Sequence, residues 1–129
     1  MDLTLTEKHR ALRDEVDRFI ARHRDGAPRP GGGRKRPDKK VLDWQKLLVE
    51  HGYAARNVPR EYGGFGAPQD IIELAVIADA FSRAGISPGL HNQGISMLVP
   101  TLLEVGTEEQ KRRWIAPTIR GEVIWCQGY

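Results

Sequence analysis

Apolar residues recur at intervals of three and four along most of this chain, and each run of them stops at a glycine or a proline. The first run contains Leu12, Val16, Phe19 and Ile20, with charged residues on the opposite side. This spacing places the apolar side chains on one face of a helix, whereas a half-buried strand would show strict alternation. The pattern predicts an all-α fold of short amphipathic helices, and 129 residues suffice for one such domain.

Capping residues indicate where the first helices begin and end. Thr4 and Glu7 fit a capping box, in which each side chain satisfies a free backbone N–H of the other, so the first helix is expected to start near Thr4. A second helix is expected from Asp38, a good N-cap, to Gly52, which adopts a left-handed turn at little cost.

The middle of the chain predicts two further helical regions. Residues 71–81 are apolar on nearly every side of a helix, so a third helix, entered through Pro68 and ended by Gly85, is expected to be central and buried. Ser87-Pro88 favours the start of a fourth helical region, in which Pro100 forces a kink or a restart because proline has no backbone N–H.

The pattern changes near the C-terminus. A last short helix is expected after a second capping box, formed by Thr107 and Gln110. From Val123 the residues are typical of a strand. The predicted organisation is therefore a helical domain over residues 1–122, with residues 123–129 as the first strand of a truncated β domain.

A proline- and glycine-rich segment, residues 25–37, interrupts the helices and leads into a basic loop from Arg29 to Lys40. Such a loop is either a solvated linker or a binding site for anions such as phosphates. The linker is the preferred interpretation. Aromatic residues are not interleaved with the charges, so specific nucleic-acid binding is not expected.

Composition limits the functional classes further. The net charge of +3, with acids and bases mixed, is too small to indicate a nucleic-acid partner. A single cysteine, Cys126, excludes an internal disulfide and suits a reducing compartment. No signal peptide or membrane span is recognisable, so a cytoplasmic location is expected. The four histidines lack the spacing of a helical metal site, and no metal is expected.

Five segments carry a joint pattern. They are Leu5-Thr6-Glu7 before Ala11-Leu12-Arg13, the run from Pro59 to Gly66 (PREYGGFG), Met97-Leu98-Val99-Pro100, the run from Gly106 to Lys111 (GTEEQK), and Gly121-Glu122 leading to Trp125-Cys126-Gln127-Gly128-Tyr129. In this order and at this spacing they resemble the N-terminal helical domain of the acyl-CoA dehydrogenases. The resemblance covers essentially the whole chain.

The resemblance implies an enzyme of three domains, helical, β and helical, that binds FAD and oxidises an acyl-CoA thioester to its 2,3-enoyl form. The family supplies its catalytic carboxylate from the C-terminal domain, so no catalytic residue is expected in this chain. Alone, the chain is predicted to be inactive and to bind FAD weakly or not at all. An oligomer, of like or unlike subunits, is also implied.

Two sets of binding residues follow from the same resemblance. The residues proposed to contact the flavin share one face of the expected strand: Trp125, Gln127 and Tyr129. The residues proposed to face the acyl chain are His91, Asn92, Ile95 and Leu98. The alternatives are an ordinary strand with a half-buried aromatic for the first set, and helix-start polarity with core packing for the second.

Two motifs are assigned structural roles. The Gly63-Gly64-Phe65-Gly66 run lacks the strand and helix of a dinucleotide site and the lysine of a P-loop, which favours a tight turn packed by Tyr62 and Phe65. Cys126 is expected to be a small buried residue rather than a nucleophile.

The preferred function is thus a fragment of a flavin-dependent acyl-CoA dehydrogenase that forms one wall of the acyl pocket and the start of the flavin site. Two alternatives remain. One is a stand-alone, non-catalytic helical interaction module. The other is one subunit of a split dehydrogenase whose partner carries the base.

Overall fold

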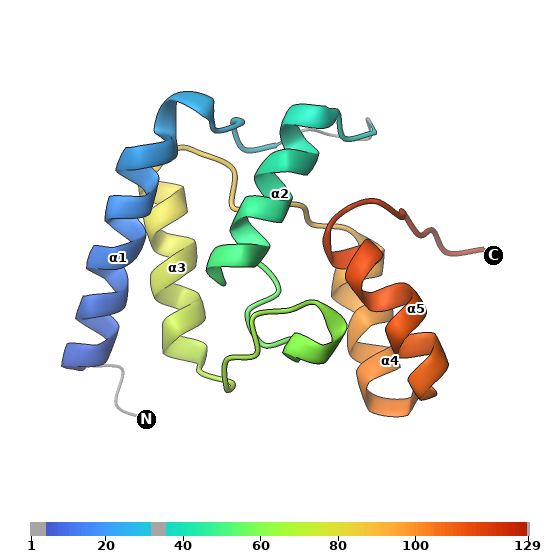
Figure 1. Cartoon of the computed structure of the whole chain (residues 1–129). Coiled ribbons are helices and arrows are strands. Elements are labelled where there is room, and N and C mark those ends of the chain that lie inside the picture. Colours follow the sequence, from blue (N-terminus) through green and yellow to red (C-terminus); the bar gives the residue numbers. More distant parts are fainter. Residues whose placement is uncertain (1–4, 32–35, 129) are drawn as a thin grey trace. The chain divides into compact units, whose positions relative to one another are not determined.

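Helices make up the regular structure of the chain in a computed structural model that describes residues 5–31 and 36–128 (Figure 1). The α-helices of this part are α1 (Glu7–His23), α2 (Lys39–His51), α3 (Ile71–Ala84), α4 (Val99–Val105) and α5 (Glu108–Ile119). Shorter elements are the 3₁₀ turns η1 (Arg24–Gly26) and η2 (Arg60–Tyr62) and the π-helix η3 (Gly94–Leu98). The described ranges contain no strand, which agrees with the predicted helical fold. None of their helices is long and apolar enough to cross a bilayer.

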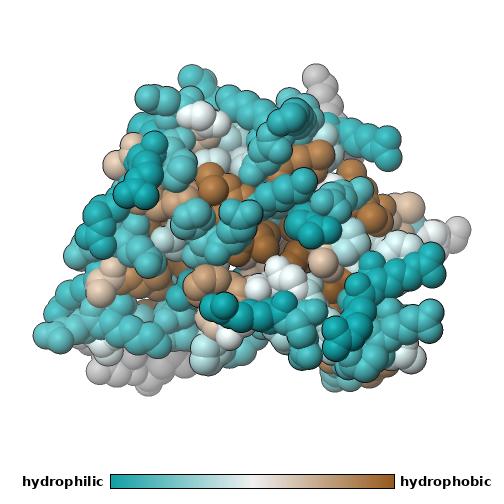
Figure 2. All heavy atoms as spheres, viewed as in Figure 1, coloured by the Kyte–Doolittle hydropathy of each residue, from teal (hydrophilic) through white to brown (hydrophobic). Residues whose placement is uncertain are grey.

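The described residues form two compact units, of which the first comprises residues 1–34 and 69–88. In this unit α1 and α3 lie side by side (Figure 1). The buried stripe of α1 is the predicted one, and its Phe19 ring lies 6.4 Å from the ring of Phe81 on α3. The face of α1 that is turned to the viewer in Figure 2 is mostly hydrophilic. The helix α1 is therefore amphipathic, as the spacing predicts.

Hydrogen bonds join the first turns of the two helices. Thr6 is the N-cap of α1, and its hydroxyl accepts from the backbone N–H of His9 at 3.3 Å. The buried His9 ring then contacts Asp70, with 3.0 Å between Nε2 and Oδ2. Asp70 is in turn the N-cap of α3 and accepts from the backbone N–H groups of Ile72 and Glu73. The hydrogen bond from His9, together with these N–H groups, lowers the pKa of Asp70.

Two predictions for this unit are wrong. The first helix begins at Glu7 rather than near Thr4, because the capping box is formed by Thr6 and His9; Thr4 itself lies outside the described residues. The third helix is not buried all round, since Ile71 is 72% exposed and Leu74 is 40% exposed. Within the unit α3 packs against a single helix, α1, which can cover only one side of it.

The second unit comprises residues 35–68 and 89–129 and contains α2, α4 and α5. Its core consists of buried side chains from all three helices and from η2: Val49, Tyr62, Val99, Ile115 and Ile119. The predicted caps are confirmed. Asp38 accepts from the N–H of Val41, Gly52 ends α2 with a φ of 77°, and the Thr107–Gln110 capping box starts α5.

The glycine-rich run forms the predicted tight turn. Tyr62 is buried, and its hydroxyl donates a 2.7 Å hydrogen bond to Oε1 of Glu108 on α5. This bond to a carboxylate raises the pKa of Tyr62 to about 12, because loss of the proton would place two negative charges side by side. Gly63 follows with a φ of 96°, and Phe65 lies directly against Gly52. The run anchors η2 to α5 and α2.

A buried glutamine fixes the segment that enters η3. Gln45 of α2 is 2% exposed; its Nε2 donates to the carbonyl of Ile119 at 2.7 Å, and its Oε1 accepts from the N–H of Leu90 at 2.7 Å. The segment is not helical, because Gly89 has a φ of 108°, outside the range of a right-handed helix, so the predicted helix start at Ser87-Pro88 is wrong. Helical structure begins only at Gln93, which immediately precedes η3.

Pro100 marks the change from π- to α-helix. The N–H of Val99 bonds to the carbonyl of Gly94, five residues back, and α4 starts at this point. Pro100 cannot donate to an earlier carbonyl, so the helix restarts around it, as predicted.

Residues 124–128 have no regular secondary structure, so the strand predicted there is not formed in the described part of the chain. A strand is defined by its hydrogen bonds to a neighbouring strand, and these residues have no such neighbour among those described. The assignment of residues 123–129 to a further β domain stays a prediction.

Candidate functional site

A small apolar hollow in the second unit brings residues of the two predicted sets together. It has a volume of about 220 Å³ and lies between the η3–α4 segment and the chain after α5. Its lining is Gln93, Met97, Leu98, Thr101, Trp125, Cys126 and Gln127. Leu98 from the predicted acyl set thus lies beside Trp125 and Gln127 from the predicted flavin set.

The remaining predicted residues lie elsewhere. His91 is exposed and does not line the hollow, and neither do Asn92 and Ile95. The side chain of Asn92 accepts from the backbone N–H of Ile95 at 3.0 Å, which is the helix-start role considered as the alternative. Tyr129 lies outside the described residues.

Sequence reasoning missed Gln93, Met97 and Thr101. These three residues are spaced four apart, so they follow one face of a helix across the π-to-α change. Met97 is 49% exposed, and its carbonyl accepts from the Thr101 hydroxyl at 2.8 Å. The four-residue spacing indicates a shared helix face, but the polar residues Gln93 and Thr101 at its ends made this face difficult to recognise as part of an apolar site.

Trp125 is the best-fixed residue of the hollow. Its indole Nε1 donates to the hydroxyl of Thr118 at 2.9 Å. Its ring meets that of Trp114 edge to face, with 5.2 Å between the ring centroids. Thr118 is fully buried, and both partners lie on α5, four residues apart. The indole is therefore half-buried and oriented, with one side toward the hollow.

Two amide side chains face each other at the hollow. Nε2 of Gln93 donates to Oε1 of Gln127 at 3.3 Å. Both residues are exposed. The hollow thus combines an apolar wall with amide donors and acceptors, a combination suited to the edge of a flat heterocycle.

Cys126 is exposed, so the prediction that it is buried is wrong. The described residues that line the hollow include no histidine and no carboxylate that could act as its base. A nucleophilic role is not supported by these surroundings. In addition, the described residues contain no group of three or more His, Cys, Asp or Glu side chains that could hold a metal ion.

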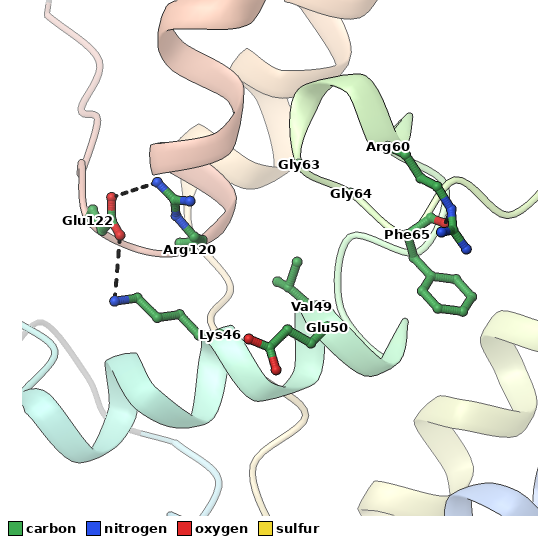
Figure 3. A pocket seen from close by; sticks show the side chains of 9 residues that line it. All are labelled: Lys46, Val49, Glu50, Arg60, Gly63, Gly64, Phe65, Arg120 and Glu122. Carbon is green, nitrogen blue, oxygen red and sulfur yellow. Dashed lines mark hydrogen bonds and ion pairs between the residues drawn. The ribbon is translucent and has the colours of Figure 1, made fainter.

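A larger hollow of about 620 Å³ also lies in the second unit (Figure 3). Here Glu122 bridges two cations, with its Oε1 3.6 Å from Nζ of Lys46 and its Oε2 3.1 Å from Nη2 of Arg120. Arg60 lies beside Phe65, away from this bridge, and donates through Nε to the Phe65 carbonyl at 3.0 Å. Lys46, Glu122 and Arg60 are engaged with protein groups, whereas the buried Nε of Arg120 has no partner among the described residues. The smaller hollow is the candidate site because it contains residues of the two predicted sets.

Comparison with known proteins decides the family. Residues 6–122 match the family description "Acyl-CoA dehydrogenase, N-terminal domain". The chain belongs to the acyl-CoA dehydrogenase family. The match covers α1 through the turn after α5 and four of the seven residues that line the smaller hollow; Trp125, Cys126 and Gln127 follow the matched region.

Curated relatives agree with this assignment. The chain is 30% identical over 67% of its length to acyl-CoA dehydrogenase IpdE1 of Mycolicibacterium smegmatis, of which it covers 21%. It is 34% identical over 63% of its length to the bovine mitochondrial short-chain specific acyl-CoA dehydrogenase, of which it covers 19%. A third match, 27% identical over 93% of the chain, is (2S)-methylsuccinyl-CoA dehydrogenase of Cereibacter sphaeroides, of which it covers 21%. The chain therefore spans about a fifth of the length of these relatives.

Solved structures share the fold. The chain aligns over 96% of its length with 32% of the Tcur3481-Tcur3483 steroid ACAD, at a TM-score of 0.62 and 30% identity. It also aligns over 95% of its length with 30% of a chain in the ChsE4-ChsE5 complex of Mycobacterium tuberculosis, at a TM-score of 0.64. The identity in the second case is 22%, so that likeness concerns the fold alone.

Proposed function

We propose that this chain is the N-terminal helical part of a flavin-dependent acyl-CoA dehydrogenase, which converts an acyl-CoA thioester into its 2,3-enoyl form. The observation that carries the proposal is the smaller hollow. It joins Leu98, from the segment proposed to line the acyl pocket, to Trp125 and Gln127, from the segment proposed to begin the flavin site. The acyl wall and the edge of the flavin would meet at this point.

The residues of the hollow fit one wall of a flavin site. Trp125, Met97 and Leu98 offer an apolar surface, and Gln127 offers an amide that can bond to a ring edge. A volume of about 220 Å³ is smaller than the roughly 300–1,000 Å³ of most ligand pockets, so further walls must come from other residues. When bound, the flavin supplies the acceptor for the hydride that leaves the acyl chain.

The task of these residues is to shape the pocket rather than to move the proton. The described lining contains no carboxylate or histidine positioned to remove a proton from the substrate. Apolar side chains from η3, Met97 and Leu98, would instead exclude water from the acyl chain and orient it. Catalysis would then need a base from outside this chain, and the chain alone would be inactive.

The proposed organisation places residues 1–122 in the helical domain and residues 123–129 at the start of the β domain, with Tyr129 completing the flavin-facing set. His91, Asn92 and Ile95 would contribute to the acyl wall through their neighbours in η3. The likeness, at 30% identity, to the Tcur3481-Tcur3483 steroid ACAD supports an oligomer of like or unlike subunits. A cytoplasmic location stays part of this proposal.

A second candidate is a non-catalytic interaction module. The exposed apolar residues Ile71 and Leu74 on α3 favour it, because such side chains are usually covered in an assembled protein. Other domains of a dehydrogenase would cover the same two residues, so their exposure fits both candidates. The hollow, in contrast, specifically favours the enzyme.

One experiment separates these candidates. The 129-residue chain and the complete polypeptide that contains it are each purified and examined for flavin absorbance after gel filtration, and for oxidation of a panel of acyl-CoA thioesters with an artificial electron acceptor. The proposal predicts flavin and activity for the complete polypeptide and neither for the isolated chain. A complete polypeptide without bound flavin or activity would contradict it.

A further inference from the structure

Gly94, the first residue of the π-helix η3, lies directly beneath Trp125. A Cβ added at this position would lie 2.6 Å from Cδ1 of Trp125 and 2.9 Å from Cγ2 of Thr118. Real Cβ atoms do not approach other atoms so closely, so even a methyl group would push these side chains away. The backbone of Gly94 does not have a positive φ, which means that space, not conformation, requires glycine here.

The backbone of Gly94 is itself held in place. Its carbonyl accepts from the N–H of Val99 across the π-turn. Just before it, the backbone carbonyl of Asn92 accepts from the N–H of Ser96 at 2.9 Å. Gly94 is also buried. A larger residue here would therefore press against Trp125 and Thr118.

The other sides of the indole are held by α5. Thr118 accepts the Nε1 hydrogen bond, and Trp114 contacts the ring edge to face. Thr118 is fully buried and cannot turn to another partner without losing its packing. Three contacts from two helical elements thus leave the indole one orientation.

That orientation decides where the following residues lie. Gln127 is two residues after Trp125, and its Oε1 accepts from Gln93, the residue before Gly94. Two adjacent contacts therefore join residues 93–94 to residues 125–127. One is between Gly94 and Trp125, and the other is between Gln93 and Gln127. If the indole moves, Gln127 loses its place beside Gln93.

We propose that Gly94, Thr118 and Trp114 are positioning residues, which fix the indole of Trp125 and thereby set the course of residues 125–127 along the hollow. The consequence for flavin binding rests on the proposed function, because it requires that Trp125 and Gln127 face the cofactor. The geometric part concerns this chain alone and can be measured without flavin.

The test compares Gly94→Ala and Thr118→Val in the full 129-residue chain. The matched control is Gly26→Ala, because an added Cβ at Gly26 meets no atom within 4 Å. The readouts are the circular-dichroism couplet of the Trp114–Trp125 pair and the backbone amide signals of Cys126 and Gln127 in nuclear magnetic resonance spectra. Both variants should weaken the couplet and shift the two signals, whereas the control should change neither.

Thr118→Val keeps a side chain of similar size and replaces the hydroxyl that accepts the indole hydrogen bond with a methyl group, so it tests the role of Thr118 even if Gly94→Ala does not fold. An unchanged couplet and unchanged Cys126 and Gln127 signals in Thr118→Val would overturn the proposal. The signals of α1 serve as the internal reference, since α1 belongs to the other unit.

The flavin consequence is tested in the complete polypeptide. Gly94→Ala should weaken flavin binding by about tenfold or more relative to the parent protein, and Gly26→Ala should not. Equal flavin affinity for Gly94→Ala and the parent would contradict the link between positioning and cofactor. A parent protein that binds no flavin would instead refute the proposed function, while the spectra of the 129-residue chain would still decide the positioning role.

Discussion

The two units of this chain are stabilised in different ways. In the first, two regular helices, α1 and α3, pack through apolar side chains such as Phe19 and Phe81. In the second, irregular segments lie between shorter helices, and single polar side chains such as Gln45 and Thr118 hold them in place. The candidate site lies entirely in the second unit. Irregular segments on a helical scaffold can bring distant residues to one place, which a pair of regular helices does less readily.

The largest expected effect concerns the apolar packing of the first unit. Phe81 is fully buried on α3, so Phe81→Ala should lower the free energy of unfolding by about 3–5 kcal/mol. Ile71→Ala, on the same helix but 72% exposed, should change it by about 0.5 kcal/mol or less. Urea unfolding followed by circular dichroism measures both variants. If Phe81→Ala and Ile71→Ala lowered the free energy of unfolding by similar amounts, the described packing of only one side of α3 would be wrong.

The next effect tests the polar packing of the second unit. Gln45→Ala removes partners from the Ile119 carbonyl and the Leu90 N–H, and each buried polar group left without a partner costs about 1–3 kcal/mol. A total loss of about 2 kcal/mol or more is expected, together with shifted amide signals around Leu90. Glu50→Ala, an exposed position on the same helix, is the control. A Gln45 variant as stable as the Glu50 variant would refute the role of Gln45.

A smaller, pH-dependent effect is expected in the first unit. The hydrogen bond from His9 lowers the pKa of Asp70. The Asp70 carboxylate therefore stabilises the folded state at pH values above the ordinary pKa of an aspartate. This stabilisation is lost as the pH falls through the lowered pKa. Asp70→Asn should therefore narrow the stability difference between neutral and strongly acidic solution. Urea midpoints from pH 7 downward measure it. An unchanged acid dependence in Asp70→Asn would exclude the hydrogen bond between His9 and Asp70 as its source.

The smallest effect is expected at high pH in the second unit. The pKa of Tyr62 is raised to about 12 by its hydrogen bond to Glu108, whereas an unfolded tyrosine ionises near about 10. The stabilisation is therefore complete below about pH 10 and declines as the pH rises toward 12. Tyr62→Phe should remove this decline, as measured by denaturant midpoints across that range. If the variant and the parent decline in parallel, other groups cause the loss.

The regular parts of the fold were predictable because their signals are local. The stripe of Val16 and Phe19 and the caps at Asp38, Gly52 and Thr107 lie within a few residues of the structures that they specify. The errors arose where a distant residue decides. Gln45 holds the backbone at Leu90, 45 residues later in the sequence, and lies against Gly89, whose φ of 108° is incompatible with the helix predicted from Ser87.

The candidate site was predictable only in part, for the same reason. Trp125, Gln127 and Leu98 were named from family motifs, and the structure brings these three to one hollow. Gln93 and Met97 were missed because polar residues, Gln93 and Thr101, stand at the two ends of their four-residue spacing and conceal the face that they share. The role of Gly94 depends on an indole 31 residues later, which no local pattern reveals.

Hydrogen–deuterium exchange on the complete polypeptide, with and without flavin, shows whether the smaller hollow faces the cofactor. We expect flavin to slow exchange in residues 93–98 and 125–128, on the two sides of the hollow, and to leave α1 unchanged. Unaltered exchange in both segments, in a protein that has demonstrably bound flavin, would contradict this expectation.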